Sequence, residues 1–175
     1  HNITNYVTVN DVANVLLACG GSPIMSDDID DVVDITSICG GLNINIGTLN
    51  KNTIPSMFAA GKKANELGHV VLLDPVGAGA SALRTNTALM VGSGSTKGVD
   101  ADVADKVTDE NLEETISKLK AFSKATGSII AVTGAIDLVC NSEKCYVIRN
   151  GKPQMSSITG TGCQLSGLMT AYLVA

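Results

Sequence analysis

Apolar residues recur along the chain with two different spacings, and the spacing decides which element each stretch can form. Apolar residues every three or four positions are typical of helices that are buried on one side. They predict helices over residues 10–19, 26–38, 52–67, 81–90, 108–122 and 164–175. Short alternating or continuous apolar runs are typical of strands, and they predict strands over residues 42–46, 69–73, 128–132, 137–140 and 144–149.

Helices that alternate with buried strands indicate an α/β fold. We predict a mainly parallel sheet with helices on both faces, because parallel strands need crossover connections that pack on the sheet. The last two strands are joined by only a few polar residues (Asn-Ser-Glu, 141–143), so they predict an antiparallel hairpin near one end.

The length of 175 residues and the apolar content of 45% suit one substantial core, so we expect a single domain over residues 1–175. Three places suggest that this domain is incomplete. The chain begins at His1 inside what looks like a structured segment, and the last helix stops at Ala175 while still apolar. The helix over residues 81–90 gives way abruptly to Gly-Ser-Gly, which predicts a missing piece around residues 91–96.

Charge and hydropathy narrow the classes of partner. Seventeen acidic against twelve basic residues give a net charge of −5 without any dense Lys/Arg cluster, which argues against nucleic acid or an anionic membrane surface. No apolar run approaches the roughly 18 residues that span a bilayer, and no signal peptide opens the chain. We therefore expect a soluble, cytoplasmic protein.

The five cysteines are odd in number and include no Cys-x-x-Cys pair, so they predict free thiols rather than a disulfide framework or a zinc site. His1 and His69 are the only histidines, which leaves few candidates for a Ser-His-Asp or Cys-His mechanism.

Residues 159–163 (TGTGC) combine a glycine-rich turn, a reactive side chain and the start of a helix. Gly160 and Gly162 permit a positive φ and a close approach of the backbone to a ligand. A helix start offers free N–H groups and the positive end of the helix dipole, so this turn suits a transferring phosphoryl group. The alternative is a common turn in which Cys163 is a small buried hydrophobic residue.

Polar residues also mark two of the predicted strands. Asn43 and Asn45 alternate with apolar residues, so they either line a site or need buried partners. Asp74 directly follows the strand over residues 69–73, at the end where open α/β sheets bind ligands.

Motifs spread over nearly the whole chain resemble those of the hydroxyethylthiazole kinases, a ribokinase-like family of small-molecule kinases in thiamin salvage. In the family's order they are residues 1–8 (HNITNYVT), 13–14 (AN), 21–25 (GSPIM), 45–49 (NIGTL), 73–80 (LDPVGAGA), 132–134 (VTG) and 159–163 (TGTGC). The resemblance implies a ribokinase-like fold and ATP-dependent phosphorylation of the hydroxyethyl group of 4-methyl-5-(2-hydroxyethyl)thiazole. It also implies Mg²⁺, ATP as co-substrate, and a homotrimer.

The same resemblance implies roles for individual residues. Met25 and Gly160 are expected to contact the thiazole alcohol, and Thr133 to contact ATP. Asn45 ends an element at the same sheet edge as Asp74, so we expect it near the thiazole alcohol as well, and we expect Thr161 of the glycine turn to contact ATP. For Met25 the alternative is plain core packing, because Met commonly fills gaps between apolar side chains.

Catalysis and metal binding are expected at three places. Cys163 stands where ribokinase-like enzymes usually carry an aspartate base in Gly-x-Gly-Asp, and Gly160 and Gly162 complete this catalytic turn. Asp74 is expected to contact a magnesium-bound water, with capping of a turn as the alternative.

Two positions depart from the family's pattern. An Arg-Gly-Asn-x-x-Glu segment, which supplies an arginine to ATP and an acid near magnesium in the family, is expected after residues 84–90, where this chain reads Gly-Ser-Gly. Ala135 replaces a glutamate that is common after Thr-Gly. Arg84 could contact phosphate, although a place on a helix surface is the alternative.

The absence of a Gly-x-x-x-x-Gly-Lys-Ser/Thr loop excludes a P-loop kinase. Two further functions stay open from the residues themselves. One is a ribokinase-like nucleotide-dependent hydratase or lyase, and the other is a non-catalytic nucleotide-binding domain.

Overall fold

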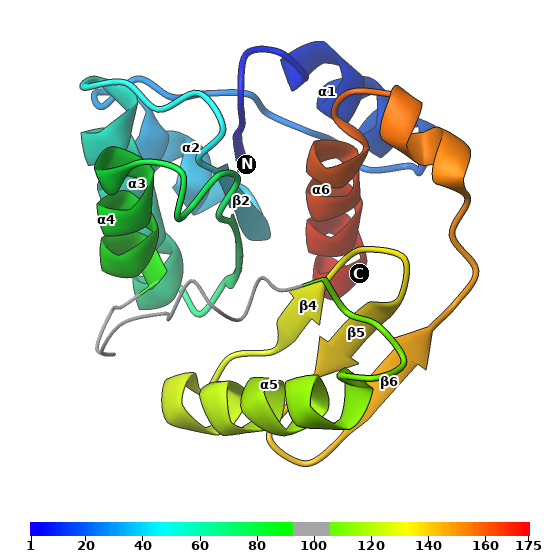
Figure 1. Ribbon diagram of the computed structural model, residues 1–175. Coiled ribbons are helices and arrows are strands. Elements are labelled where there is room, and N and C mark those ends of the chain that lie inside the picture. The colour runs from blue at the N-terminus through cyan, green and yellow to red at the C-terminus, as the bar shows by residue number, and fades with distance from the viewer. Residues whose placement is uncertain (93–105) are drawn as a thin grey trace. The chain divides into compact units, whose positions relative to one another are not determined.

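A computed structural model describes residues 1–92 and 106–175, and these fall into two compact units (Figure 1). The first unit comprises His1–Gly92 and Thr159–Ala175, and the second comprises the described part of Ser93–Ile158. Each unit is treated by itself below. Of the stretch where a missing piece is predicted, residues 91–92 end a helix and residues 93–96 lie outside the described residues.

The first unit is built on a parallel sheet in the order β1-β2-β3. These strands are β1 (Asn2–Ile3), β2 (Gly41–Asn45) and β3 (Val70–Asp74). All five residues of β2 are buried, as its central position requires, and its last residue pairs with the last residue of β3. The predicted strands over residues 42–46 and 69–73 are therefore confirmed, while the two-residue β1 was not predicted.

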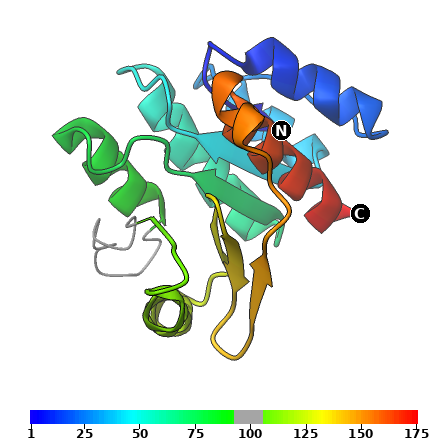
Figure 2. The same cartoon turned by 45° about the vertical axis from the view of Figure 1, so that its right-hand side comes forward.

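Helices cover both faces of this sheet, as predicted. They are α1 (Val9–Ala18), α2 (Val32–Ile38), α3 (Thr53–Glu66), α4 (Ala82–Gly92) and α6 (Thr161–Val174). Alternate residues of β2 sort between the faces: Leu42 and Ile44 join the core formed with α3, and the side chain of Asn45 bonds to α6. Figures 1 and 2 show the sheet between these two helices.

The second unit contains an antiparallel sheet in the order β4-β5-β6. Its strands are β4 (Ile130–Val132), β5 (Asp137–Cys140) and β6 (Cys145–Ile148), with α5 (Leu112–Thr126) packed on β5 and a 3₁₀ helix, η2 (Pro153–Ser157), following them. Its core is formed by Leu119 of α5 with Leu138 and Cys140 of β5, among others. The predicted hairpin is confirmed, and the strand predicted at residues 128–132 pairs with it rather than with the parallel strands.

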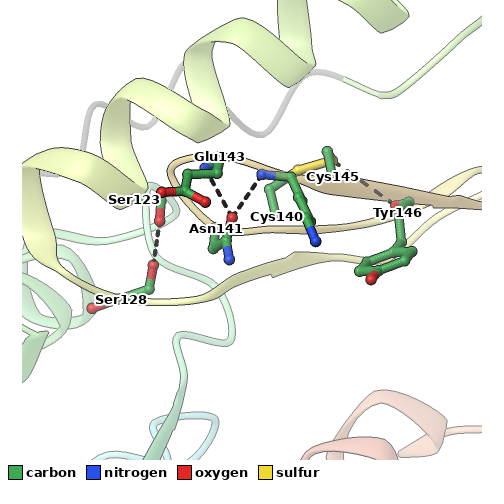
Figure 3. Close-up of a disulfide and its surroundings, with 8 residues drawn as sticks. Ser123, Ser128, Cys140, Asn141, Glu143, Cys145 and Tyr146 are labelled. Atoms are coloured by element: carbon green, nitrogen blue, oxygen red, sulfur yellow. Dashed lines mark hydrogen bonds between the residues drawn. A yellow bond between two sulfur atoms is a disulfide. The ribbon is translucent and has the colours of Figure 1, made fainter.

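The prediction of free thiols is wrong for two cysteines of the second unit. Cys140 and Cys145 form a disulfide across the β5–β6 hairpin (Figure 3). The register places the two residues directly opposite each other, and Asn141 Oδ1 closes the turn by accepting from the N–H of Glu143 at 2.8 Å and of Lys144 at 2.7 Å. Cys19, Cys39 and Cys163 are free.

Over the part of the chain that the structure describes, no helix is both long and apolar enough to cross a membrane.

Candidate active site

Four polar side chains meet at the carboxyl ends of the parallel strands, beside the start of α6. Asn45 ends β2, Asp74 ends β3, Asn5 follows β1 in the loop toward α1, and Cys163 lies in the first turn of α6. We call these four residues the polar cluster. Strand ends of a parallel sheet share one edge, and a helix that packs on β2 and β3 presents its start there, so the fold itself gathers them.

Asn45 is the centre of the polar cluster, and each end of its amide is bonded. Its Nδ2 donates to Asp74 Oδ2 at 2.7 Å and to Cys163 Sγ at 3.3 Å. Its Oδ1 accepts from Asn5 Nδ2 at 3.2 Å and from the backbone N–H of Gly47 at 2.9 Å. A buried amide is costly unless it is hydrogen-bonded, and this side chain, in a residue 1% exposed, has no unbonded end.

Cys163 is 7% exposed, and its sulfur accepts hydrogen bonds from two amides. Asn5 Nδ2 donates to Sγ at 2.9 Å, and Asn45 Nδ2 donates at the 3.3 Å given above. The residue also joins an apolar cluster with Val12 and Leu16 of α1. Cys163 is thus buried, as the packing alternative predicts, and its sulfur is also held in a polar network.

Burial raises the pKa of Asp74 above its ordinary value of 3.8, and hydrogen bonds from Ser166 and Asn45 oppose that rise. Desolvation disfavours the charged carboxylate, while donors that stabilise it work in the other direction. A cation near Asp74 would therefore stabilise its carboxylate, whose negative charge is disfavoured by burial in the free protein.

The glycine turn has the conformation that its first glycine permits. Gly160 has φ of +82° and precedes the first residue of α6, Thr161, and no side chain caps this helix start by a hydrogen bond. A Cβ atom built at Gly160 would lie 2.2 Å from Thr8 Cγ2, so the position also lacks room for a side chain. Gly162 does not use the freedom of a glycine: it has no positive φ, because it lies inside α6, and a Cβ there would meet nothing within 4 Å. Its part in the catalytic turn stays a prediction.

Comparisons with known proteins identify the family. A model of the hydroxyethylthiazole kinase family matches residues 1–94 and 87–175. The chain is 60% identical over 196 residues to the hydroxyethylthiazole kinase of Clostridium acetobutylicum, covering 100% of this chain and 72% of the relative. It is 47% identical to that of Ruminiclostridium cellulolyticum, over 98% of this chain and 69% of the relative. The chain belongs to the hydroxyethylthiazole kinase family.

A solved structure supports the same family. The hydroxyethylthiazole kinase of Pyrococcus horikoshii OT3 matches with a TM-score of 0.88 and 35% identity, covering 100% of this chain and 70% of that one. The predicted α/β fold of this family is therefore confirmed.

Most residues that the sequence assigns to the kinase site lie in the first unit. Met25 forms an isolated bridge with Asn2 of β1 and packs against the apolar cluster that contains Cys163. Thr161 opens α6. Thr133 belongs to the second unit, where it is exposed directly after β4.

Sequence reasoning missed the contribution of Asn5 and Ser166 to this site. Asn5 follows β1, which has only two residues. Ligands bind at the ends of parallel strands, so Asn5 could have been predicted only if this short strand had been recognised. Arg84 does not lie free on a helix surface: its guanidinium donates to the carbonyl oxygens of Gly47 at 2.8 Å and Val76 at 3.4 Å.

The donor set suits magnesium better than a metal that needs a complete protein cage. Within residues 1–92 and 106–175, no three His, Cys, Asp or Glu side chains gather into a metal-binding group. Mg²⁺ keeps several waters and takes one or two carboxylates together with substrate phosphates. Asp74, with one oxygen already bonded to Asn45, fits a magnesium ion that it contacts through water.

A cavity of about 830 Å³ opens elsewhere in the first unit, and its lining contains none of the residues predicted for the site. It is lined by Tyr6, by residues 27–30, which include three aspartates, and by residues 50–53 with Pro55. The Tyr6 hydroxyl donates to Asp27 Oδ2 at 2.6 Å across it. The three aspartates make this lining unfavourable for a phosphate.

Proposed function

We propose that this chain uses ATP to phosphorylate the hydroxyl group of 4-methyl-5-(2-hydroxyethyl)thiazole, and that the reaction takes place at the polar cluster. The observation that carries the proposal is the meeting of Asn45, Asp74 and Cys163 beside an uncapped helix start. Family membership supports the reaction class, and this geometry supports the place.

Phosphoryl transfer requires mainly that the reactants are positioned and that the developing charge is neutralised. The backbone N–H groups of residues 160–163 stand at the positive end of α6, so they suit the transferring phosphoryl group. Gly160 allows the chain to reach that place, since only glycine fits its φ and its contact with Thr8. We assign Gly160, Gly162 and Thr161 to this backbone cradle.

Cys163 is proposed to face the hydroxyl of the thiazole alcohol and, as its thiolate, to accept the hydroxyl proton as the new O–P bond forms and the bond between the γ-phosphorus and the ADP leaving group breaks. Its sulfur already accepts two amide hydrogen bonds, so it is arranged as an acceptor. Met25 packs beside the apolar cluster of Cys163 and is proposed to contact the thiazole ring, with Asn45 on the polar side.

The remaining assignments concern ATP, the metal and the assembly. Thr133 is proposed to contact ATP, and Asp74 to hold Mg²⁺ through water. Magnesium would neutralise phosphate charge when bound. A homotrimer and a cytoplasmic location stay predictions from the sequence.

The decisive experiment measures ATP-dependent phosphorylation of the thiazole alcohol by the purified chain, with Cys163→Ala and Cys163→Asp as variants. We expect Cys163→Ala to lower kcat by roughly 10²- to 10⁴-fold, the usual contribution of a positioned acid or base. Cys163→Asp should keep activity, because a carboxylate at this place is also an acceptor. A wild-type kcat in the Ala variant would show that Cys163 is only packing.

Met25→Asp tests the proposed contact with the ring. A carboxylate placed against an apolar ring should weaken binding of the thiazole alcohol by roughly 1 to 3 kcal/mol, measured by calorimetry. Met25→Leu is the matched control, because it keeps an apolar side chain of similar volume. Equal affinity of the Asp variant and the wild type would remove Met25 from the site.

We further propose that the encoded protein contains residues that interrupt this chain near the end of α4. The match to the Clostridium acetobutylicum kinase extends over 196 residues, whereas this chain has 175. The family model matches in two pieces that overlap at residues 87–94. Peptide mapping across residues 84–97 tests the idea, and a peptide with no additional residues would show a shortened variant.

A further inference from the structure

Asn5 is the one member of the polar cluster to which neither the sequence nor the family likeness assigns a role. Its Nδ2 donates to Cys163 Sγ at 2.9 Å and to Asn45 Oδ1 at 3.2 Å. Its Oδ1 accepts from the hydroxyl of Thr8 at 3.1 Å. Asn5 is 5% exposed and Thr8 is 2% exposed, so neither side chain can exchange these partners for bulk water.

The direction of every hydrogen bond in this network follows from one backbone group. The N–H of Gly47 can only donate, so the Asn45 atom that faces it must be the oxygen. The other end of Asn45 is then its NH₂ group, which suits the carboxylate of Asp74. Because the oxygen of Asn45 also faces Asn5, the Asn5 atom at that contact must be its nitrogen.

These assignments also determine the hydrogen-bonding role of the Cys163 sulfur. Asn5 Nδ2 also faces Cys163 Sγ, and so does Asn45 Nδ2, so two N–H donors point at the same sulfur atom. The sulfur can only accept at these two contacts. In the thiolate, the lone pair that remains is free to accept from a group that is not part of the network.

Thr8 secures this orientation from the far side of Asn5. Its hydroxyl faces Asn5 Oδ1, and its backbone carbonyl accepts from the N–H of Val12 at 2.9 Å in the first turn of α1. Its methyl group fills the space where Gly160 has no side chain. Thr8 therefore ties the amide of Asn5 to the turn that precedes Cys163.

We propose that Asn5 is a positioning residue of the phosphoryl transfer. Oriented by Thr8, it holds the Cys163 sulfur so that, in the thiolate that takes up the substrate proton, the remaining lone pair is directed at the substrate hydroxyl. This inference rests on the proposed function for the identity of the substrate. The orientation of the sulfur is a separate claim, and it can be tested without any activity.

Asn5→Asp is the decisive variant, because it keeps the shape and the oxygen that faces Thr8 but replaces the donating NH₂ group by an acceptor. We expect kcat to fall by about 10- to 100-fold, the effect of losing a hydrogen bond to a charged or partly charged acceptor. KM for ATP and for the thiazole alcohol should change less than about threefold, because neither ligand loses a contact.

The Thr8 pair provides a milder and matched comparison. Thr8→Val is nearly isosteric but removes the hydroxyl, so kcat should fall several-fold as Asn5 loses its fixed orientation. Thr8→Ser keeps the hydroxyl and should retain kcat within about twofold. Equal kcat values in the two variants would overturn the role of Thr8.

A double-mutant cycle separates positioning from general damage to the fold. If Asn5 acts through the sulfur, Asn5→Asp should cause no further loss of kcat in a Cys163→Ala background. An equal loss in both backgrounds would show a structural effect and overturn the proposal.

Crystal structures of the wild type and of Asn5→Asp provide the readout that is independent of catalysis. The introduced carboxylate should leave the sulfur, since two acceptors cannot share a hydrogen bond. A carboxylate that stays within hydrogen-bond distance of Sγ would show that this contact does not depend on a donating NH₂ group, which overturns the proposal. An inactive wild type with the expected structures would instead refute only the proposed substrate.

Discussion

The two units stabilise their sheets in different ways. In the first unit β2 is buried on both faces, with an apolar face toward α3 and asparagine side chains toward α6. In the second unit α5 packs against the sheet, while Tyr146 and Val147 of β6 stay exposed at 66% and 39%, and a disulfide closes the hairpin. One sheet is held by burial and the other partly by a covalent bond.

This difference shows where a reaction can be positioned. Polar groups buried in the first unit must hydrogen-bond to one another. The donor or acceptor role of each group therefore fixes the role of its neighbour. Thr133 in the second unit is exposed, so bulk water can replace any of its hydrogen bonds. The contrast supports the proposal that the acceptor hydroxyl is oriented in the first unit, and the proposal can be tested by perturbing each unit separately.

Gly160→Ala should produce the largest effect and should act on the first unit. The added Cβ would take a strained φ of +82° and collide with Thr8, which together should lower the free energy of unfolding by roughly 2 to 5 kcal/mol. Hydrogen exchange should show faster exchange in β2 and β3, with β5 and β6 unchanged.

Gly162→Ala is the control for that variant. A Cβ at this position meets no atom within 4 Å, and alanine is favoured over glycine inside a helix. We expect a gain of about 0.5 to 1 kcal/mol. A destabilisation equal to that of Gly160→Ala would show that the turn as a whole rejects side chains.

Reduction of the Cys140–Cys145 disulfide should have the next largest effect and should act on the second unit. The bond closes a short loop, with a sequence separation of 5, so the chain-entropy model assigns it about 2 kcal/mol. Dithiothreitol should therefore speed exchange in β5 and β6 and leave β2 unaffected. In a variant that lacks both cysteines, the reductant should change nothing.

Asp74→Asn should have the smallest effect on stability, and its sign depends on pH. Because burial raises the pKa of Asp74, the folded state holds its proton more tightly than the unfolded chain does. Folding is thus opposed by this group at pH values above the ordinary 3.8, and stability is lost as the pH rises through the pKa of the folded state.

The Asn variant removes that dependence and can still accept a hydrogen bond from Asn45. Its urea midpoint should equal or exceed that of the wild type at pH 7, and the difference should shrink as the pH falls toward 3.8. Kinase activity should fall at every pH if Asp74 holds magnesium. A wild type that is the more stable protein at pH 7 would contradict the unfavourable charge.

The sequence predicts the long elements and part of the site because burial leaves a periodic pattern. The alternation of polar and apolar residues around Asn45 predicts both the strand and its polar face. The position of Asp74 after a buried apolar run predicts that it lies at the sheet edge where the parallel strands end. A strand of two residues leaves no such pattern, so β1 and the role of Asn5 were missed. The disulfide was missed because an odd number of cysteines was taken as evidence against any pairing. The register of the predicted hairpin nevertheless places Cys140 opposite Cys145.

The sequence leaves the pairing of β4 open for a different reason. A continuous apolar run indicates burial, but it does not distinguish a parallel partner from an antiparallel one. Hydrogen-bond directions were likewise beyond the sequence, since they depend on the Gly47 N–H facing Asn45.

The hydrogen bond between Asn5 and Cys163 joins positions 158 residues apart. During synthesis the amino-terminal strand and its loop leave the ribosome long before Cys163 has been translated. Until then the amide of Asn5 lacks the sulfur that accepts its hydrogen bond, and the sheet lacks the helix α6 that packs on it. Until α6 has been translated and has packed on the sheet, the nascent chain is thus expected to expose both polar and apolar surface there. We expect chaperones to bind the chain most strongly at that stage.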